Sequence, residues 1–153
     1  MTWVLDASMS LAWLFKRADL AEAVLAEKAL NELASVSAIV PAIWFAEVAH
    51  GILRGERQGV VQPAQTAFFL NQMSEAEIER DEESPQTHQA TVLYLARTYG
   101  LSAYDATYLE LAMRSDAVLA TFDRKLAVAV RKAGGRIFGD AVQTGGQRTA
   151  NDR

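Results

Sequence analysis

Short apolar runs alternate with longer helical segments along this chain, and that alternation most restricts its fold. We expect strands at residues 2–5, 36–40, 117–120 and 136–138, and an edge strand in the polar segment 77–80. The main runs are almost continuously apolar, which is typical of strands that are covered on both faces. Strands separated by helices predict an α/β fold with a mostly parallel central sheet of short strands.

The expected helices fill the intervals between these strands. Their starts are marked by Asp19 and Ser102 as N-caps and by prolines at positions 41, 63 and 85, and Gly100 is a C-cap. Gly55 and Gly59 are expected to loosen the end of the third helix. The predicted helices cover residues 9–15, 19–34, 41–56, 63–74, 85–99, 102–115 and 123–133.

Length and composition favour one globular domain. The chain has 153 residues, of which 50% are hydrophobic and 22% charged, which is enough for a single core. We expect this domain to span residues 1–140, and the polar segment 141–153 to be a frayed tail. No run approaches the length of about 20 apolar residues that a membrane span needs, and no targeting signal is evident.

Residue types that are missing or rare exclude several kinds of chemistry. The chain has no cysteine, so disulfides, thiolate nucleophiles and cysteine-rich metal sites are excluded. This fits a reducing cytoplasm, which is the expected location. The formal net charge of -4 disfavours binding to nucleic acid through bulk positive charge, although a local basic patch remains compatible with it.

Acidic residues follow the expected strands. Asp6 comes directly after the first strand and Asp123 shortly after the strand at 117–120, while Glu47 lies in the second turn of the helix after the second strand. These three points share one edge of a parallel sheet, where α/β folds bind their ligands. Asp105 lies in the first turn of its helix, and the sequence alone does not place it at that edge.

Each acid also has a purely structural explanation. Asp6 and Asp123 are suitable helix caps, and Ser102 with Asp105 matches a capping box. Glu47 is harder to explain in this way, because its helix is otherwise apolar and a buried carboxylate needs a partner. His50 and Arg54 are the candidate partners.

Taken together, the acids favour a metal site. Neighbouring carboxylates repel one another, so at least one stays protonated unless a cation joins them. Mg²⁺ and Mn²⁺ prefer oxygen ligands, and carboxylate-held ions of this kind activate water and stabilise leaving oxygens in nucleases.

The order of these motifs resembles that of the PIN-domain ribonucleases. The matching segments are residues 4–8 (VLDAS), Glu47 after Pro41, residues 101–106 (LSAYDA) and residues 120–123 (ATFD). The resemblance covers residues 1–140 and is strongest to the VapC-type toxins of bacterial type II toxin–antitoxin systems. It implies an α/β/α sandwich with Mg²⁺- or Mn²⁺-dependent endoribonuclease activity.

The same resemblance implies roles for particular residues and partners. Asp6, Glu47, Asp105 and Asp123 would be the catalytic, metal-binding acids, and Thr121 would orient a carboxylate or a water. Ser8 would support them. The implied partners are an RNA substrate, a cognate antitoxin protein and a second copy of the chain in a homodimer.

Other functions remain as alternatives. These are a PIN nuclease of RNA processing that is not a toxin, and a non-enzymatic acidic domain that binds metal or only caps helices. A phosphoryl-transfer enzyme of the haloacid dehalogenase type also has an acid after its first strand. That chemistry needs a second acid two residues later, where this chain has Ser8. A receiver-like domain needs paired early acids and a lysine at a strand end, and neither pattern is clear.

The remaining large or charged residues give weaker indications. Three cations near the expected site are candidates for contacts with RNA phosphates: Arg17, Arg124 and Lys125. Four aromatic residues are expected to lie mostly in the core, with some available to line a groove for a partner or a dimer face: Trp13, Trp44, Phe68 and Phe69. His50 and His88 are expected to be structural or exposed.

Overall fold

A parallel sheet runs through the middle of the molecule. The structure is a computed structural model that describes residues 1–141, and within them the sheet has five strands in the order β3-β2-β1-β4-β5. Every neighbouring pair is parallel, which confirms the α/β prediction. The strands are β1 (Thr2–Leu5), β2 (Ser37–Val40), β3 (Ile78–Arg80), β4 (Val118–Ala120) and β5 (Arg136–Ile137).

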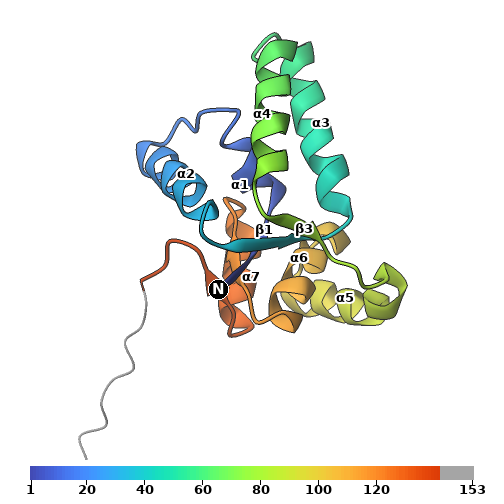
Figure 1. The fold of residues 1–153 in the computed structure, drawn as a ribbon. Coiled ribbons are helices and arrows are strands. Elements are labelled where there is room, and N and C mark those ends of the chain that lie inside the picture. The colour runs from blue at the N-terminus through green and yellow to red at the C-terminus, as the bar shows by residue number, and fades with distance from the viewer. Residues whose placement is uncertain (142–153) are drawn as a thin grey trace, which may run out of the picture.

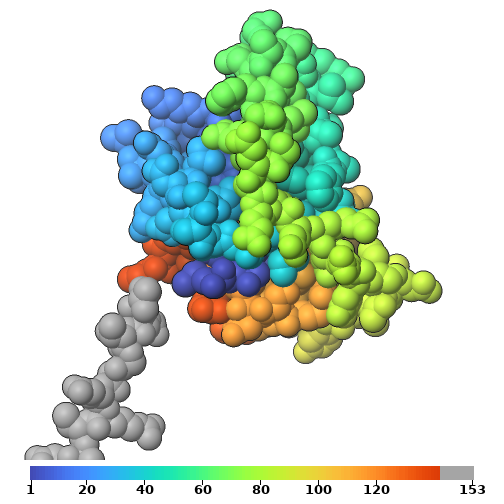
Figure 2. Space-filling model, in the orientation of Figure 1, coloured from blue at the N-terminus to red at the C-terminus, as the bar shows by residue number. Residues whose placement is uncertain are grey.

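Helices cover both faces of this sheet. In Figure 1, α1 to α4 lie on one side of the sheet and α5 to α7 on the other, so the fold is the expected α/β/α sandwich. The hairpin of α3 and α4 projects beyond the sheet, and it forms a separate lobe of the surface in Figure 2. The helices are α1 (Ala7–Leu11), α2 (Leu20–Leu33), α3 (Ile43–Arg57), α4 (Pro63–Glu75), α5 (Pro85–Tyr99), α6 (Ala103–Arg114) and α7 (Arg124–Lys132).

The edge strand expected in a polar segment is present. β3 pairs with β2, with Ala38 opposite Ile78 and Val40 opposite Arg80. A polar strand is tolerated here because an edge strand has only one neighbour and leaves much of its surface in water. Except for residue 141, the tail expected at 141–153 lies outside the described residues.

The first helix differs from its prediction. We expected it at residues 9–15, but α1 begins at Ala7, directly after the strand, and ends at Leu11, followed by turns. The chain here packs against two glycines of α3. A Cβ atom at Gly51 would overlap Leu11, and one at Gly55 would overlap Phe15. Gly55 thus lies inside α3 and permits close packing, whereas we expected it to loosen the helix end.

The core is centred on the middle strands. Trp3, Val4 and Leu5 of β1 are almost completely buried between the two helical layers. Trp44 and Phe69 also lie in the core as expected, and Trp13 is half-buried. Phe68 is the one of the four that is not in the core, since 72% of that residue is exposed on α4. No helix in the described part of the chain is long and apolar enough to cross a membrane.

Candidate metal-binding site

Two central strands end side by side and place the first site residues together. Leu5 of β1 pairs with Ala120 of β4, and the Asp6 backbone N–H donates to the Ala120 carbonyl at 3.0 Å. Asp6 and Thr121 are the residues that directly follow these strands. The parallel order of the sheet therefore brings together residues that are 115 positions apart in the sequence.

The carboxylate of Asp6 is held by hydroxyl groups. Its residue is 5% exposed, and Oδ2 accepts hydrogen bonds from Ser8 Oγ at 2.5 Å and from Thr121 Oγ1 at 2.6 Å. Ser8 Oγ also accepts from the Phe122 N–H at 2.9 Å, which links the ends of β1 and β4. The Asp6 side chain makes no capping bond to α1, so the helix-cap explanation does not apply to this residue.

Glu47 has a different partner from the cations that we expected. Its Oε1 accepts a hydrogen bond from the Tyr108 hydroxyl at 2.7 Å, and His50 is exposed. The sequence analysis missed Tyr108. A signal for it exists, because Tyr108 follows Asp105 by three residues and therefore lies on the same face of α6, one turn along.

Asp105 and Asp123 lie at the first turns of α6 and α7. The Ser102 hydroxyl caps α6 by accepting from the Asp105 N–H at 3.1 Å, and the Asp105 carboxylate lies near enough to Asp123 and Asp6 for their charges to raise its pKa. Asp123 does cap its helix, since its Oδ1 accepts from the Leu126 N–H at 2.8 Å. Its own N–H donates to Thr121 Oγ1 at 2.9 Å. The capping explanation and the site explanation therefore hold together for Asp123.

The four carboxylates share one electrostatic environment. Burial raises the pKa of Asp6, and the charge of Asp123 raises it further. The hydrogen bonds from Ser8 and Thr121 lower it, but they do not outweigh the burial. Burial also raises the pKa of Glu47, with added repulsion from Asp6 and Asp105. The pKa of Asp105 is raised by burial and then by Asp123 and Asp6. The structure thus brings together all four acids that the sequence singled out, including Asp105.

The acids have the oxygen ligands that a hard divalent cation prefers, but they do not surround one ion position. Within residues 1–141, no three acidic or histidine side chains converge tightly enough to form a ready-made metal cage. The carboxylates nevertheless repel one another in a partly buried place, and a divalent cation held by oxygen ligands relieves that repulsion. Lys125 is the cation whose charge favours ionised Asp105.

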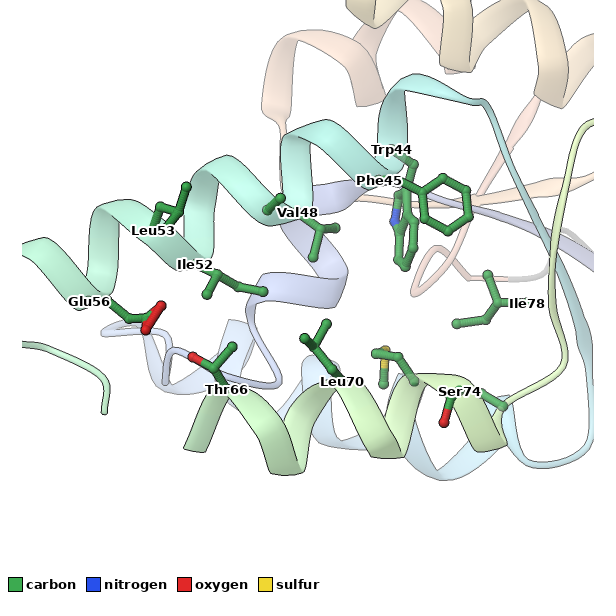
Figure 3. Close-up of a pocket in the computed structure, with 13 residues that line it drawn as sticks. Trp44, Phe45, Val48, Ile52, Leu53, Glu56, Thr66, Leu70, Ser74 and Ile78 are labelled. Atoms are coloured by element: carbon green, nitrogen blue, oxygen red, sulfur yellow. The ribbon is translucent and has the colours of Figure 1, made fainter. Parts of the chain in front are cut away.

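Two cavities lie near or beside this site. One, of about 830 Å³, adjoins the acids through Ser8, Phe122 and Arg124. The other, of about 600 Å³, lies between α3 and α4 and has an apolar lining, as Figure 3 shows for Val48, Ile52 and Leu70. None of the four acids lines either cavity, but Ser8 lines the first and donates to the Asp6 carboxylate, so the acid site adjoins the first cavity.

Comparison with known proteins identifies the family. The model of the PIN domain matches residues 3–132, so this chain belongs to the PIN domain family, within a superfamily of nucleases. This confirms the resemblance that the strand-end motifs carried.

Particular solved structures share the fold. The crystal structure of PAE2754 from Pyrobaculum aerophilum is 23% identical, with a TM-score of 0.60 over 88% of this chain and 99% of that one. FitAcB from Neisseria gonorrhoeae is 18% identical, with a TM-score of 0.57 over 89% of this chain and 96% of that one. No curated protein matched the sequence.

Proposed function

We propose that this chain is a divalent-metal-dependent endoribonuclease and the VapC-type toxin of a toxin–antitoxin pair. The observation that carries the nuclease proposal is geometric: β1 and β4 end side by side with Asp6 and Asp123 just beyond them, and Glu47 of α3 and Asp105 of α6 lie near enough for their charges to act on these acids. Inside a PIN domain, clustered carboxylates that form no ion pair with the described residues of the chain are the expected ligands of a metal ion.

The side chains have distinct tasks in this proposal. Asp6, Glu47, Asp105 and Asp123 would hold Mg²⁺ or Mn²⁺, and the bound ion would supply charge neutralisation and an activated water for phosphodiester hydrolysis. Thr121 and Ser8 fix the orientation of the Asp6 carboxylate through their hydrogen bonds. Tyr108 does the same for Glu47, and its burial excludes water from that side.

A cleavage assay tests the nuclease proposal. Purified protein should cut single-stranded RNA in Mg²⁺ or Mn²⁺ and lose that activity in EDTA. Ca²⁺ should bind but support little turnover, because its looser and larger coordination does not hold octahedral geometry. Activity that persists after thorough chelation would exclude a metal mechanism, and no activity with any ion would favour a non-enzymatic domain.

The groove between α3 and α4 supports an antitoxin partner. Phe45, Leu53 and Leu70 line it and remain about half exposed, at 50%, 46% and 50%. An amphipathic segment of a partner protein buries such residues in a groove. Trp44 lines the groove as expected, whereas Trp13 does not and donates its indole N–H to the Ala26 carbonyl at 2.8 Å.

Co-expression tests the toxin proposal. A small protein encoded beside this chain should rescue growth and co-purify with it. Leu53→Asp should weaken that complex, while Val128→Asp is the matched control, because Val128 is also 46% exposed but lies on α7. If overexpression of the chain harms nothing and no neighbouring protein binds, the toxin proposal fails while the nuclease proposal stands.

A homodimer is part of the same proposal. α5 contributes no buried residue, and its Leu93 and Tyr94 are 44% and 65% exposed, which supports a second copy as the cover of this helix. Light scattering of the purified chain measures its mass, and a Leu93→Asp variant should shift it to that of a monomer.

A further inference from the structure

The larger cavity combines aromatic and basic side chains next to the acids. Its volume of about 830 Å³ lies within the range of sites that hold small organic ligands. Phe15 and Phe122 supply aromatic surface, and Lys16, Arg17 and Arg124 supply positive charge. This is the combination with which proteins hold one nucleotide of a single strand.

Arg17 is fixed in place over an aromatic ring. Its guanidinium carbon lies 4.6 Å from the centre of the Phe122 ring. Glu22 Oε2 accepts a hydrogen bond from Nε at 2.9 Å and lies 2.8 Å from Nη2 in an ion pair, and these contacts hold the guanidinium in place. The Arg17 side chain remains 34% exposed. It therefore presents a planar, preorganised surface to the cavity, and nucleobases stack on such surfaces.

Two other cations that line the cavity, Lys16 and Arg124, are available to contact a phosphate. Asp19 and Glu22 also line the cavity, but Asp19 accepts from the Glu22 N–H at 2.9 Å and Glu22 is paired with Arg17. Lys16 and Arg124 are exposed, and neither forms an ion pair with any residue that the structure describes.

The cavity is physically joined to the acid site. Ser8 lines the cavity and at the same time donates to the Asp6 carboxylate and accepts from the Phe122 N–H. Phe122 itself lies between Thr121 and Asp123 in the sequence. A strand with one phosphodiester at the acids would therefore place a neighbouring nucleotide at this cavity.

We propose that the cavity is a nucleotide subsite, in which a base of single-stranded RNA stacks against the Arg17–Phe122 pair and its phosphate lies at Lys16 and Arg124. The inference rests on the proposed nuclease function, because it names where that site holds its substrate. Arg17 is then a determinant of substrate binding and makes no contribution to the metal site.

The test measures binding without cleavage. Fluorescence anisotropy in EDTA compares a labelled single-stranded RNA octamer with a labelled octamer of the same ribose-phosphate chain without bases. Arg17→Gln should weaken binding of the RNA about fivefold or more, as expected for the loss of a stacking surface, and change binding of the base-free chain much less. Phe122→Leu, with its fold checked by a thermal melt, should have the same base-dependent effect.

Arg131→Gln is the matched control, because Arg131 is also paired with a carboxylate, that of Asp140, but lies away from the cavity on α7. If Arg17→Gln weakens binding of the RNA no more than Arg131→Gln does, or weakens binding of the RNA and of the base-free chain equally, the proposed subsite is wrong. The cavity would then attract RNA through its charge alone. If Arg17-dependent binding of the bases is found but no RNA is cut in Mg²⁺ or Mn²⁺, the nuclease proposal fails and the subsite stands.

Discussion

Two clusters of carboxylates in residues 1–141 differ in one respect: the acids of one form ion pairs with Arg114 and His88, whereas those of the other form none. At the first, Arg114 binds Asp81 at 2.6 Å and Glu110 at 2.8 Å, and His88 lies between Glu83 and Glu110. Burial raises the pKa of Asp81, but the hydrogen bonds from Arg114 outweigh it, so the pKa lies below its usual range.

Asp6, Glu47, Asp105 and Asp123 form no ion pair with any residue in 1–141, although the charge of Lys125 acts on Asp105. Asp6 accepts hydrogen bonds from the Ser8 and Thr121 hydroxyl groups and Glu47 from that of Tyr108, and the pKa of each carboxyl is raised, first by burial and then by the repulsion of neighbouring acids. An ion pair that the chain completes by itself stabilises the fold, whereas acids held together without a cation leave a place for a ligand. The difference separates a structural cluster from a candidate site.

The largest expected effect is on activity. Asp6→Asn should lower RNA cleavage roughly a thousandfold or more, because it removes a charged ligand from the proposed metal site. The amide oxygen still accepts from Ser8 and Thr121, and one repelling charge is gone. The metal-free variant should therefore be as stable as the wild type or more stable by about 1 kcal/mol. Parallel RNase assays in Mg²⁺ and thermal melts in EDTA check both. Full activity would remove Asp6 from the site.

Asp123→Asn should also abolish cleavage and preserve the fold, since asparagine is an equally good cap for α7. Asp123→Ala loses that cap and should cost about 1 kcal/mol of stability in addition. Equal stability of the asparagine and alanine variants would contradict the capping bond.

Removal of Arg114 from its cluster should lower stability and leave cleavage unchanged, which is the opposite of the result expected for the acids at the strand ends. Arg114→Met leaves Glu110, which is 5% exposed, without its main partner, and should lower the free energy of unfolding by about 3 kcal/mol. Cleavage by the folded variant should not change. Arg131→Met, which breaks the exposed pair with Asp140, is the control and should cost less than about 1 kcal/mol in urea denaturation. If Arg114→Met lost cleavage without losing stability, the cluster around Arg114 would not have a purely structural role.

Acidification should change the contributions of the two clusters to the free energy of unfolding in opposite directions. The folded protein holds protons on Asp6, Glu47 and Asp105 more tightly than the unfolded chain does, so stability rises as the pH falls toward about 4. Below that pH the lowered pKa of Asp81 acts in the other direction, and its contribution is lost.

In EDTA, the melting temperature should thus be a few degrees higher near about pH 5 than near about pH 8. Asp6→Asn should narrow this difference, and saturating Mg²⁺ should raise the melting temperature mainly at the higher pH, where the carboxylates are ionised. A melting temperature that falls steadily on acidification would contradict the coupling of the acids.

The smallest expected effect concerns the hydroxyl that holds Glu47. Tyr108→Phe removes one hydrogen bond in a fully buried residue and should cost about 1 kcal/mol of stability and about tenfold in cleavage. Tyr94→Phe is the matched control, since Tyr94 is 65% exposed. Equal effects of the two variants would show that Glu47 does not depend on Tyr108 for its orientation.

The sequence predicted the strands and most helix starts because their signals are local. Apolar runs, the Asp19 and Ser102 caps and the Gly100 C-cap, which has a φ of 63°, each act within a few residues. The first helix was misplaced because its bounds depend on contacts with α3, which local patterns do not contain. Which of the four aromatic residues would be exposed could not be predicted, because helical spacing does not show which face has a neighbour, and the structure shows that it is Phe68.

The site was predictable to a similar extent. The positions of Asp6 and Asp123 follow from the strand ends, and parallel pairing of β1 with β4 brings them together. The convergence of Asp105 depends on how α6 packs on the sheet, and the partner of Glu47 depends on a contact across 61 residues. Local spacing places Tyr108 on the same helix face as Asp105 but does not show that it reaches Glu47, so Tyr108 was missed, and the resemblance supplied the role of Asp105.

The spacing along α3 has a consequence for genetics. Glu47, Gly51 and Gly55 follow one another at intervals of four residues, so they lie along one face of the helix. The glycines accept Leu11 and Phe15, and both of these side chains line the larger cavity. Any larger residue at either glycine must displace a cavity wall without touching an acid. A screen for lost activity should therefore recover Gly51 and Gly55 together with the carboxylates, although neither glycine has a side chain with which to take part in the chemistry.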